Sequence, residues 1–259
     1  MITSDLISVI TPSYNVEKYI SHAIESVLNQ SYKKWELIIV DDNSSDDTVK
    51  IIQKYLKIDK RIKLIQLEKN MGAGYCRNLA IKNAIGQFHS FLDSDDLWHE
   101  KKLEVQVNFM ISNNIAFSFM SYDFINERGE KLNIEPIVVK EKVSYLDMIK
   151  TNSIGCLTAM YDLKLLDNSK IYMSEIRLRQ DLSLWLKILK KIDYAYPIDN
   201  IQSSYRIRKK SISSNKIKVI YYQWKLYRKV EDMSFIKSLY FLVFYIYYGL
   251  LKYINKNIL

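Results

Sequence analysis

Apolar runs of five to seven residues alternate with amphipathic segments along the first 120 residues, and this rhythm limits the fold more than any other feature. Four of the runs are predicted strands: Leu6–Thr11, Trp35–Val40, Arg61–Leu67 and Phe88–Leu92. The segments after them space their apolar residues as one-sided helices do: Val16–Leu28, Asp46–Lys57, Gly74–Ile85 and His99–Ser112. Such alternation builds an α/β fold, with a mainly parallel sheet flanked by helices.

Short signals mark where these elements begin and end. Ser45 is placed to cap the second of these helices, and Gly86 to end the third in a left-handed conformation. After Ile115–Ile125 the alternation weakens, and Asn126–Gly129 has the composition of a hairpin turn. The elements beyond that turn are predicted to be less regular.

The predicted strand at Phe88–Leu92 runs directly into three acids, Asp93, Asp95 and Asp96. Open α/β sheets bind ligands at the carboxyl ends of their strands. Three neighbouring carboxylates repel one another, and a divalent cation shared with substrate phosphates compensates such a group. The alternative is a solvated acidic turn that caps the next helix. The residues alone leave both interpretations open.

Length and composition restrict the kind of protein. With 259 residues, 48% of them hydrophobic, the chain suffices for one large α/β domain plus an appendage. The two cysteines, Cys76 and Cys156, form no CxxC pair, which fits a reducing compartment and provides no metal cage. Because Asp5 and a strand follow the first residues at once, we expect no secretory signal and a cytoplasmic catalytic part.

Positive charge is concentrated toward the C-terminus. Residues 201–259 carry 12 Lys and Arg against two acids, a net charge of +10, whereas the other residues have a net charge of −1. An anionic partner, either nucleic acid or a phospholipid surface, is therefore expected.

The uncharged segment Ser238–Leu251, flanked by Lys237 and Lys252, favours the phospholipid surface. A bilayer core needs about 20 residues, so this segment is too short to span it. Its tyrosines and flanking lysines suit a helix in the head-group interface. We therefore expect a membrane surface and no nucleic acid, and the alternative is a helix packed on the domain.

Polar loops follow all four predicted strands. Their sequences are ITPSYN at 10–15, VDDNSSDDT at 40–48, NMGAGYCRN at 70–78 and FLDSDDLW at 91–98. No glycine-rich dinucleotide fingerprint follows the first strand. In this combination and order, the chain resembles the family 2 glycosyltransferases, nucleotide-sugar-dependent enzymes with a Rossmann-like GT-A fold. The resemblance covers about the first 110 residues and continues more loosely to about residue 214.

This resemblance implies a division of the chain. A GT-A domain at 1–214 would comprise a nucleotide-sugar-binding half at 1–110 and an acceptor-binding half at 111–214. A basic, aromatic helical tail that associates with a membrane would follow at 215–259.

The resemblance also implies a donor site at the first three loops. Pro12 and Tyr14 would line it, with Tyr14 stacked on the uracil of a UDP-sugar. Asp42 would accept a hydrogen bond from the base, and Arg77 would lie near the base or the diphosphate.

A divalent metal, Mn²⁺ or Mg²⁺, is implied at the fourth loop. Asp95 would be its principal ligand, and Asp93 would reach the ribose or the metal. A cation there would hold the two phosphates and stabilise the charge of the leaving UDP. Arg208 stands where a similar segment of the family, Tyr-Arg-x-His, has its His. An arginine can pair with phosphate but cannot bind a metal or act as a general base.

The catalytic base would be Asp181. An inverting glycosyl transfer needs a carboxylate that takes the proton of the acceptor hydroxyl. Gln180, Asp181 and Trp185 are similar to the family's Glu-Asp motif with its following Trp, although Gln180 replaces the usual Glu. Asp181 also suits the start of a helix whose apolar stripe includes Leu182 and Leu186, and both roles are compatible.

The resemblance therefore implies an inverting hexosyltransferase that uses UDP-glucose or UDP-galactose. Its acceptor would be a lipid-linked sugar, GlcNAc- or GalNAc-diphospho-undecaprenol, used in O-antigen or polysaccharide assembly. The enzyme would bind peripherally to the cytoplasmic face of the bacterial inner membrane. Another acceptor, in capsule, teichoic acid or a protein glycan, is the nearest alternative.

Two further alternatives belong to other classes. One is a metal-dependent phosphotransferase of the haloacid dehalogenase type, whose Asp-x-Asp strand normally opens the fold, whereas here the motif follows the fourth strand. The other is a non-catalytic membrane-surface module, which we would expect to have lost Asp95 or Asp181.

Overall fold

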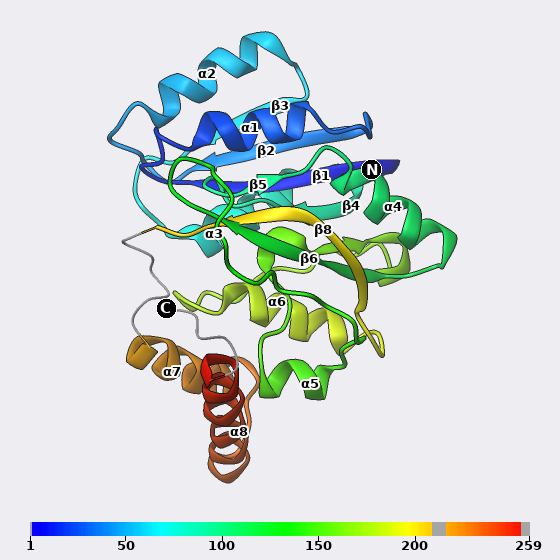
Figure 1. Ribbon diagram of the computed structural model, residues 1–259, viewed down its shortest axis with the longest axis vertical. Coiled ribbons are helices and arrows are strands. Elements are labelled where there is room, and N and C mark those ends of the chain that lie inside the picture. The colour runs from blue at the N-terminus through cyan, green and yellow to red at the C-terminus, as the bar shows by residue number, and fades with distance from the viewer. Residues whose placement is uncertain (1, 209–215, 255–259) are drawn as a thin grey trace.

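The computed structural model describes residues 2–208 and 216–254 and is built around one eight-stranded sheet (Figure 1). The strand order is β3-β2-β1-β4-β7-β6-β8-β5. The strands are β1 Thr3–Ser13, β2 Trp35–Asp41, β3 Ile62–Gln66, β4 Gly86–Phe91, β5 Leu97–Trp98, β6 Phe117–Ile125, β7 Met160–Asp162 and β8 Tyr196–Arg206. The α-helices are α1 Ile20–Leu28, α2 Thr48–Ile58, α3 Ala73–Asn83, α4 Lys102–Ser112, α5 Tyr145–Lys150, α6 Gln180–Leu189, α7 Lys216–Lys225 and α8 Phe235–Ile254.

The first four strands pair in parallel, as the alternation predicts. β2 is buried along its whole length because helices cover both faces of this half. Beyond β4 the sheet is mixed. β7 pairs antiparallel with β4 and β6, β8 runs parallel to β6, and the short β5 closes the edge antiparallel to β8. The α/β fold is confirmed, and its parallel part is the β3-β2-β1-β4 half.

Two hydrophobic clusters lie on opposite faces of the sheet. Val9 and Leu37 face one cluster together with α1 and α4, whereas Ile10 and Ile38 face the other together with α3 and α6. This alternation follows from the two-residue period of a strand.

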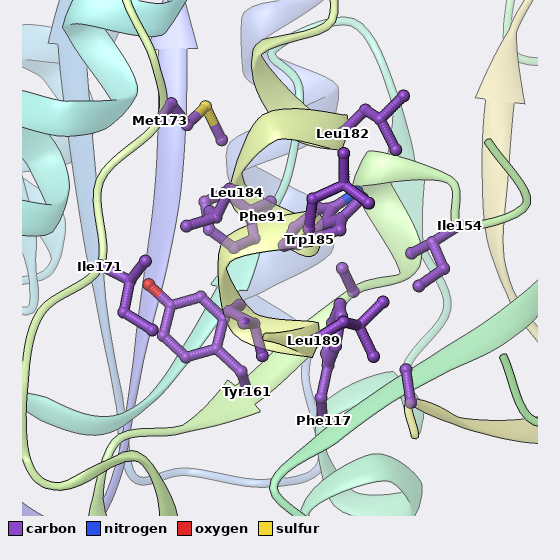
Figure 2. Packing of buried hydrophobic residues seen from close by; sticks show 14 of the residues in the cluster. Phe91, Phe117, Ile154, Tyr161, Ile171, Met173, Leu182, Leu184, Trp185 and Leu189 are labelled. Carbon is purple, nitrogen blue, oxygen red and sulfur yellow. The ribbon is translucent and has the colours of Figure 1, made fainter. Parts of the chain in front are cut away.

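α6 supplies the centre of the second cluster. Figure 2 shows Trp185 among the surrounding apolar side chains, with its ring 5.3 Å from Phe91 and 5.1 Å from Phe117 between centroids. Leu182, Trp185, Leu186 and Leu189 are all buried, so the predicted apolar stripe of α6 is confirmed. The packing fixes the start of α6, and with it the backbone at Asp181.

Two local predictions are wrong. Ser45 does not cap α2: its N–H donates to Asn15 Oδ1 at 2.9 Å, and Asp46 instead accepts the N–H of Thr48. Gly86 is not a left-handed helix end but the first residue of β4. A Cβ there would lie 2.6 Å from the carbonyl oxygen of Leu6, so the glycine is needed for a close strand contact. The Asn126–Gly129 turn is confirmed, with Gly129 at φ 86° and its N–H bonded to Asn126 O.

The tail packs on the domain through buried polar contacts. A π-helical turn at Leu226–Val230 follows α7, and Tyr227 donates from its hydroxyl to Ile149 O at 2.6 Å. Glu231 is nearly inaccessible, pairs with Lys190 at 2.7 Å and accepts a hydrogen bond from Tyr145. The tail lies at the end of the molecule opposite α2 (Figure 1).

α8 has one packed and one exposed side. Ser238 and Phe241 are buried, which bears out the packed-helix alternative for this side. The other side exposes apolar residues in helical register: Ile236, Leu239, Tyr240, Val243, Ile246, Tyr247 and Leu250. Within residues 2–208 and 216–254, no helix has the length and apolar character needed to cross a membrane.

Candidate active site

The predicted donor loops meet at one edge because β1, β2, β3 and β4 are parallel and their carboxyl ends coincide. Pro12 lies within β1, opposite Val40 of β2, and is buried. Tyr14 comes directly after β1 and is 49% exposed, so its ring is free to receive a planar ligand.

Asp42 shapes the neighbouring loop. Its side chain is buried, and its two oxygens accept the N–H groups of Met71 at 2.6 Å and Gly72 at 2.8 Å. Gly72 has a φ of 90°, a conformation that glycine adopts readily. Asp42 therefore holds the loop that leads into α3, a role that the sequence did not predict.

Arg77 connects the donor edge to α6. This buried residue donates from Nη2 to Asp93 Oδ1 at 2.5 Å and from Nη1 to Gln180 Oε1 at 3.4 Å. A Cβ at Gly74 would lie 2.9 Å from the Gln180 side chain, so the glycine lets α6 approach α3 closely. Burial lowers the pKa of Arg77, but the charges of Asp93 and, more weakly, Asp181 raise it on balance. Asp181 therefore belongs to the same electrostatic cluster.

The acid turn at 93–96 is held by arginines from the end of β8 and from the segment after it. Asp95 Oδ2 pairs with Arg208 Nε at 2.7 Å, and Arg206 donates from Nε to Asp95 O at 2.6 Å and from its backbone N–H to Asp96 at 2.8 Å. Burial raises the pKa of Asp95, an effect that Arg208 opposes and Asp93 reinforces. Burial and the neighbouring acids raise the pKa of Asp96 well above its ordinary value. The turn therefore depends on cations for stability.

Asp181 lies at the first turn of α6, partly exposed, and accepts a hydrogen bond from Asn152 Nδ2 at 3.2 Å. The packing of α6 holds the carboxylate of Asp181 in place. Its hydrogen bond from Asn152 uses one of the two carboxylate oxygens. Asn152 comes from an irregular segment that no sequence pattern marked.

Two further residues of the site were missed from the sequence. The thiol of Cys156 has its pKa raised well above the ordinary value, first by burial, and it also responds to Arg77, Asp93 and Asp181. It therefore lies among the candidate catalytic groups. Arg206 is buried against the acid turn, and its signal was the Tyr-Arg pair that precedes Arg208.

A metal at this edge would have few protein ligands. Among the described residues, no group of three or more His, Cys, Asp or Glu side chains is arranged to hold a metal ion. Asp93 and Asp95 each use one oxygen in an ion pair, which leaves the second oxygen of each. Mg²⁺ is usually bound by one or two carboxylates together with substrate phosphates and water, and this donor set fits that arrangement.

The fold is that of an α/β enzyme with its candidate site at the carboxyl edge of the parallel strands, and comparison with known proteins gives the family. The Glycosyl transferase family 2 profile matches residues 8–168. The chain therefore belongs to glycosyltransferase family 2, and it is a glycosyltransferase with a GT-A-like fold.

Two curated relatives match almost the whole chain. The putative teichuronic acid biosynthesis glycosyltransferase TuaG of Bacillus subtilis is 46% identical over 233 residues, which are 90% of this chain and 91% of TuaG. The UDP-Glc:α-D-GlcNAc-diphosphoundecaprenol β-1,3-glucosyltransferase WfgD of Escherichia coli is 40% identical, over 95% of this chain and 94% of WfgD.

Among solved structures, TarS of S. aureus in complex with UDP-GlcNAc superposes with a TM-score of 0.70 at 25% identity. The match covers 93% of this chain and 71% of that one. A mannosyltransferase of Pyrobaculum calidifontis in complex with GDP-Man and Mn²⁺ has a TM-score of 0.67 at 16% identity, a likeness of fold alone.

Proposed function

We propose that this enzyme transfers a hexose, glucose or galactose, from a UDP-sugar to a lipid-linked sugar acceptor with inversion at the anomeric carbon. The acceptor would be GlcNAc- or GalNAc-diphospho-undecaprenol in O-antigen or polysaccharide assembly. The observation that carries the proposal is Arg77, whose bonds to Asp93 and Gln180 join the donor edge to the helix that bears Asp181. In the proposed division of labour, residues 1–110 bind the donor, 111–214 the acceptor and 215–259 the membrane.

In this proposal the donor lies along the carboxyl edge of the parallel strands. Tyr14 stacks on the uracil, and Pro12 supports the turn in which Tyr14 stands. Asp42 still has lone pairs beyond its two backbone contacts and accepts a hydrogen bond from the base. Arg77 and Arg208 stabilise the diphosphate, and their ion pairs with Asp93 and Asp95 hold both guanidinium groups at the acid turn.

Asp95, with Asp93 beside it, would hold Mn²⁺ or Mg²⁺. Such an ion, when bound, supplies charge stabilisation to the departing diphosphate. The buried acid turn favours a cation because burial raises the pKa of Asp95.

Asp181 removes the proton of the attacking acceptor hydroxyl. The hydrogen bond from Asn152 and the packed helix hold the carboxylate in place, and in this proposal its other oxygen accepts the proton. The name of the relative WfgD supports the stereochemistry, since forming a β-linkage from the α-linked glucose of UDP-glucose inverts the anomeric centre.

The tail places the enzyme peripherally on the cytoplasmic face of the inner membrane. Support comes from the net charge of +10 over residues 201–259 and from the exposed apolar side of α8. Apolar burial and attraction of lysines to anionic lipid both contribute to such binding. The similarity to TuaG keeps another polysaccharide acceptor as the second candidate.

A donor and acceptor screen tests the proposal. The full-length protein is incubated with UDP-glucose, UDP-galactose or either N-acetylated UDP-sugar, each with a GlcNAc-diphosphate-lipid analogue, and the product linkage is determined. We expect one hexose donor to give a β-linked product, formed about 10²–10⁴ times more slowly by the Asp181→Asn variant. Transfer to no diphosphate-lipid acceptor, or an α-linked product, would contradict the proposed function.

A further inference from the structure

Arg179 links the start of α6 to the tail. It stands immediately before α6, two residues from Asp181, with φ at 69°, a left-handed conformation that is uncommon outside glycine. Its guanidinium donates a hydrogen bond to the hydroxyl of Tyr245 in α8, and its Cζ lies 5.1 Å from the centroid of that ring. One arginine thus joins the candidate base to the tail helix.

Arg179 differs in its charge balance from Arg77 and Arg208. Arg77 and Arg208 each form an ion pair with an acid of the 93–96 turn. Across the part of the chain that the structure describes, Arg179 forms no ion pair, and its Nε is buried without a hydrogen-bond partner. Burial lowers the pKa of Arg179, although the charge of Asp181 opposes this. The side chain is partly exposed and lacks a matching anion.

The order of groups along this surface matches the order of groups in a lipid-linked sugar. Asp181 faces the acceptor hydroxyl in the proposed function, and Arg179 comes next. Beyond Tyr245, the C-terminal part of α8 exposes the apolar side chains of Ile246 and Leu250. This end of α8, red in Figure 1, is the end nearest α6. The corresponding order in the acceptor is sugar, diphosphate and hydrocarbon chain.

We propose that Arg179 binds a lipid-borne phosphate, and specifically the diphosphate next to the acceptor sugar, with Tyr245 as a positioning residue that holds the guanidinium. A guanidinium is well suited because its planar fork gives two parallel hydrogen bonds to phosphate oxygens. This inference rests on the proposed function, because the diphosphate belongs to the lipid-linked acceptor proposed there.

The kinetic test compares two acceptors that differ only in the diphosphate. One is a GlcNAc-diphosphate-alkyl lipid and the other a neutral alkyl GlcNAc glycoside, both assayed with the full-length enzyme. Arg179→Gln should raise the KM for the diphosphate acceptor roughly 10- to 100-fold, as expected for loss of a charged hydrogen bond. The KM for the neutral glycoside and for the UDP-sugar should not change. Arg177→Gln, which alters an exposed arginine two residues away, is the matched control.

Other outcomes separate the remaining explanations. If Arg179→Gln impairs both acceptors equally, and Tyr245→Phe does the same, Arg179 only supports α6 and the inference is wrong. If the variant instead weakens binding to phosphatidylglycerol vesicles and leaves the acceptor KM unchanged, the phosphate belongs to a membrane lipid and the acceptor assignment is wrong.

A direct binding measurement distinguishes the failure of this inference from the failure of the proposed function. If the parent enzyme transfers to no acceptor, calorimetric titration with the diphosphate lipid still decides. Binding by the parent that is lost in Arg179→Gln supports the phosphate site alone. Equal binding by the two proteins, or none by either, overturns it.

Discussion

On the β3-β2-β1-β4 side of the sheet, the candidate donor residues lie at the carboxyl end of a parallel strand or in the helix that follows it. On the β7-β6-β8 side, the candidate acceptor residues come from the start of α6 and from an irregular segment, and Arg206 and Arg208, at and just after the end of β8, reach the donor edge. The carboxyl ends of parallel strands lie at one edge of a sheet, so the loops that follow these strands come together there. In the mixed half, antiparallel strands end at opposite edges of the sheet. Its side chains therefore come together only through packing between segments that are distant in sequence.

The two sides also hold their charges differently. At the donor edge the acids are matched by Arg77 and Arg208 in ion pairs of 2.5 and 2.7 Å. On the acceptor side Asp181 has a neutral partner, Asn152, and Arg179 has an aromatic one, Tyr245. In the proposed function, the acids of the donor edge are therefore offset by arginines before a substrate binds, whereas Asp181 and Arg179 are left to interact with the hydroxyl and the phosphate of the acceptor.

The largest expected effect is at the donor edge. Asp95→Ala should abolish measurable transfer and weaken UDP binding in Mn²⁺ or Mg²⁺, because several kcal/mol of charge stabilisation would be lost. EDTA should have the same effect on the parent enzyme. Asp59→Ala is the control, since it removes another arginine-paired loop acid, bonded to Arg61 and distant in sequence from the acid turn. Full activity in EDTA would limit diphosphate stabilisation to Arg77 and Arg208.

On the acceptor side, Asp181→Asn should lower kcat by about 10²–10⁴, because the amide cannot accept the proton. UDP affinity, measured by calorimetry, should hardly change, since the proposed function has Asp181 act on the acceptor. Asp193→Asn, an exposed acid just beyond α6, is the control. If turnover survives within a few-fold, as would fit a helix-start residue, another acid must be the base.

Sequence patterns predicted the donor side better because they depend on residues that are close together in the sequence. The loops with Tyr14, Asp42, Arg77 and Asp95 were placed at one edge from strand alternation alone. Contacts between distant segments were not predictable, such as Arg208 with Asp95, or Gly86 against Leu6. A glycine required by a neighbouring strand looks the same in sequence as one that ends a helix.

The acceptor side shows the same limit more strongly. Asp181 was found through its motif, but Asn152, Cys156 and Arg206 join the site through tertiary packing that leaves no periodic signal. The tail segment suggested either membrane contact or core packing. α8 packs through Phe241 on one side and exposes apolar residues on the other, so its buried side was visible only in the structure.

Two variants with substitutions on opposite sides of α8 sharpen this point. Changing both Val243 and Leu250 to Glu should weaken binding to anionic vesicles roughly 10- to 100-fold, because two apolar side chains leave the interface. The free energy of unfolding should stay the same, since both side chains are exposed. Phe241→Ala should instead cost about 3–5 kcal/mol of stability. Vesicle sedimentation and thermal unfolding measure the two effects, and unchanged sedimentation of the double variant would show that α8 does not bind membranes.

The smallest expected effect lies at the seam between the two halves. His89 of β4 pairs in register with Tyr161 of β7, and its Nδ1 lies 2.9 Å from the Tyr161 hydroxyl. Burial, with a smaller contribution from Lys170, lowers the pKa of His89 to about 3. The unfolded chain takes up a proton near pH 6.5, but the folded protein does not, so stability is greatest above that pH and falls as the pH drops toward 3.

The loss of stability should be about 1.4 kcal/mol for each pH unit in this window. Urea unfolding between pH 7.5 and 5 would measure the slope, which His89→Asn should remove and His22→Asn, at an exposed position, should leave in place.

Coincident loss of near-UV and far-UV signals would indicate that the donor and acceptor halves unfold as one unit across this seam. Separate transitions would mean that the β4–β7 pairing joins two independently folding parts.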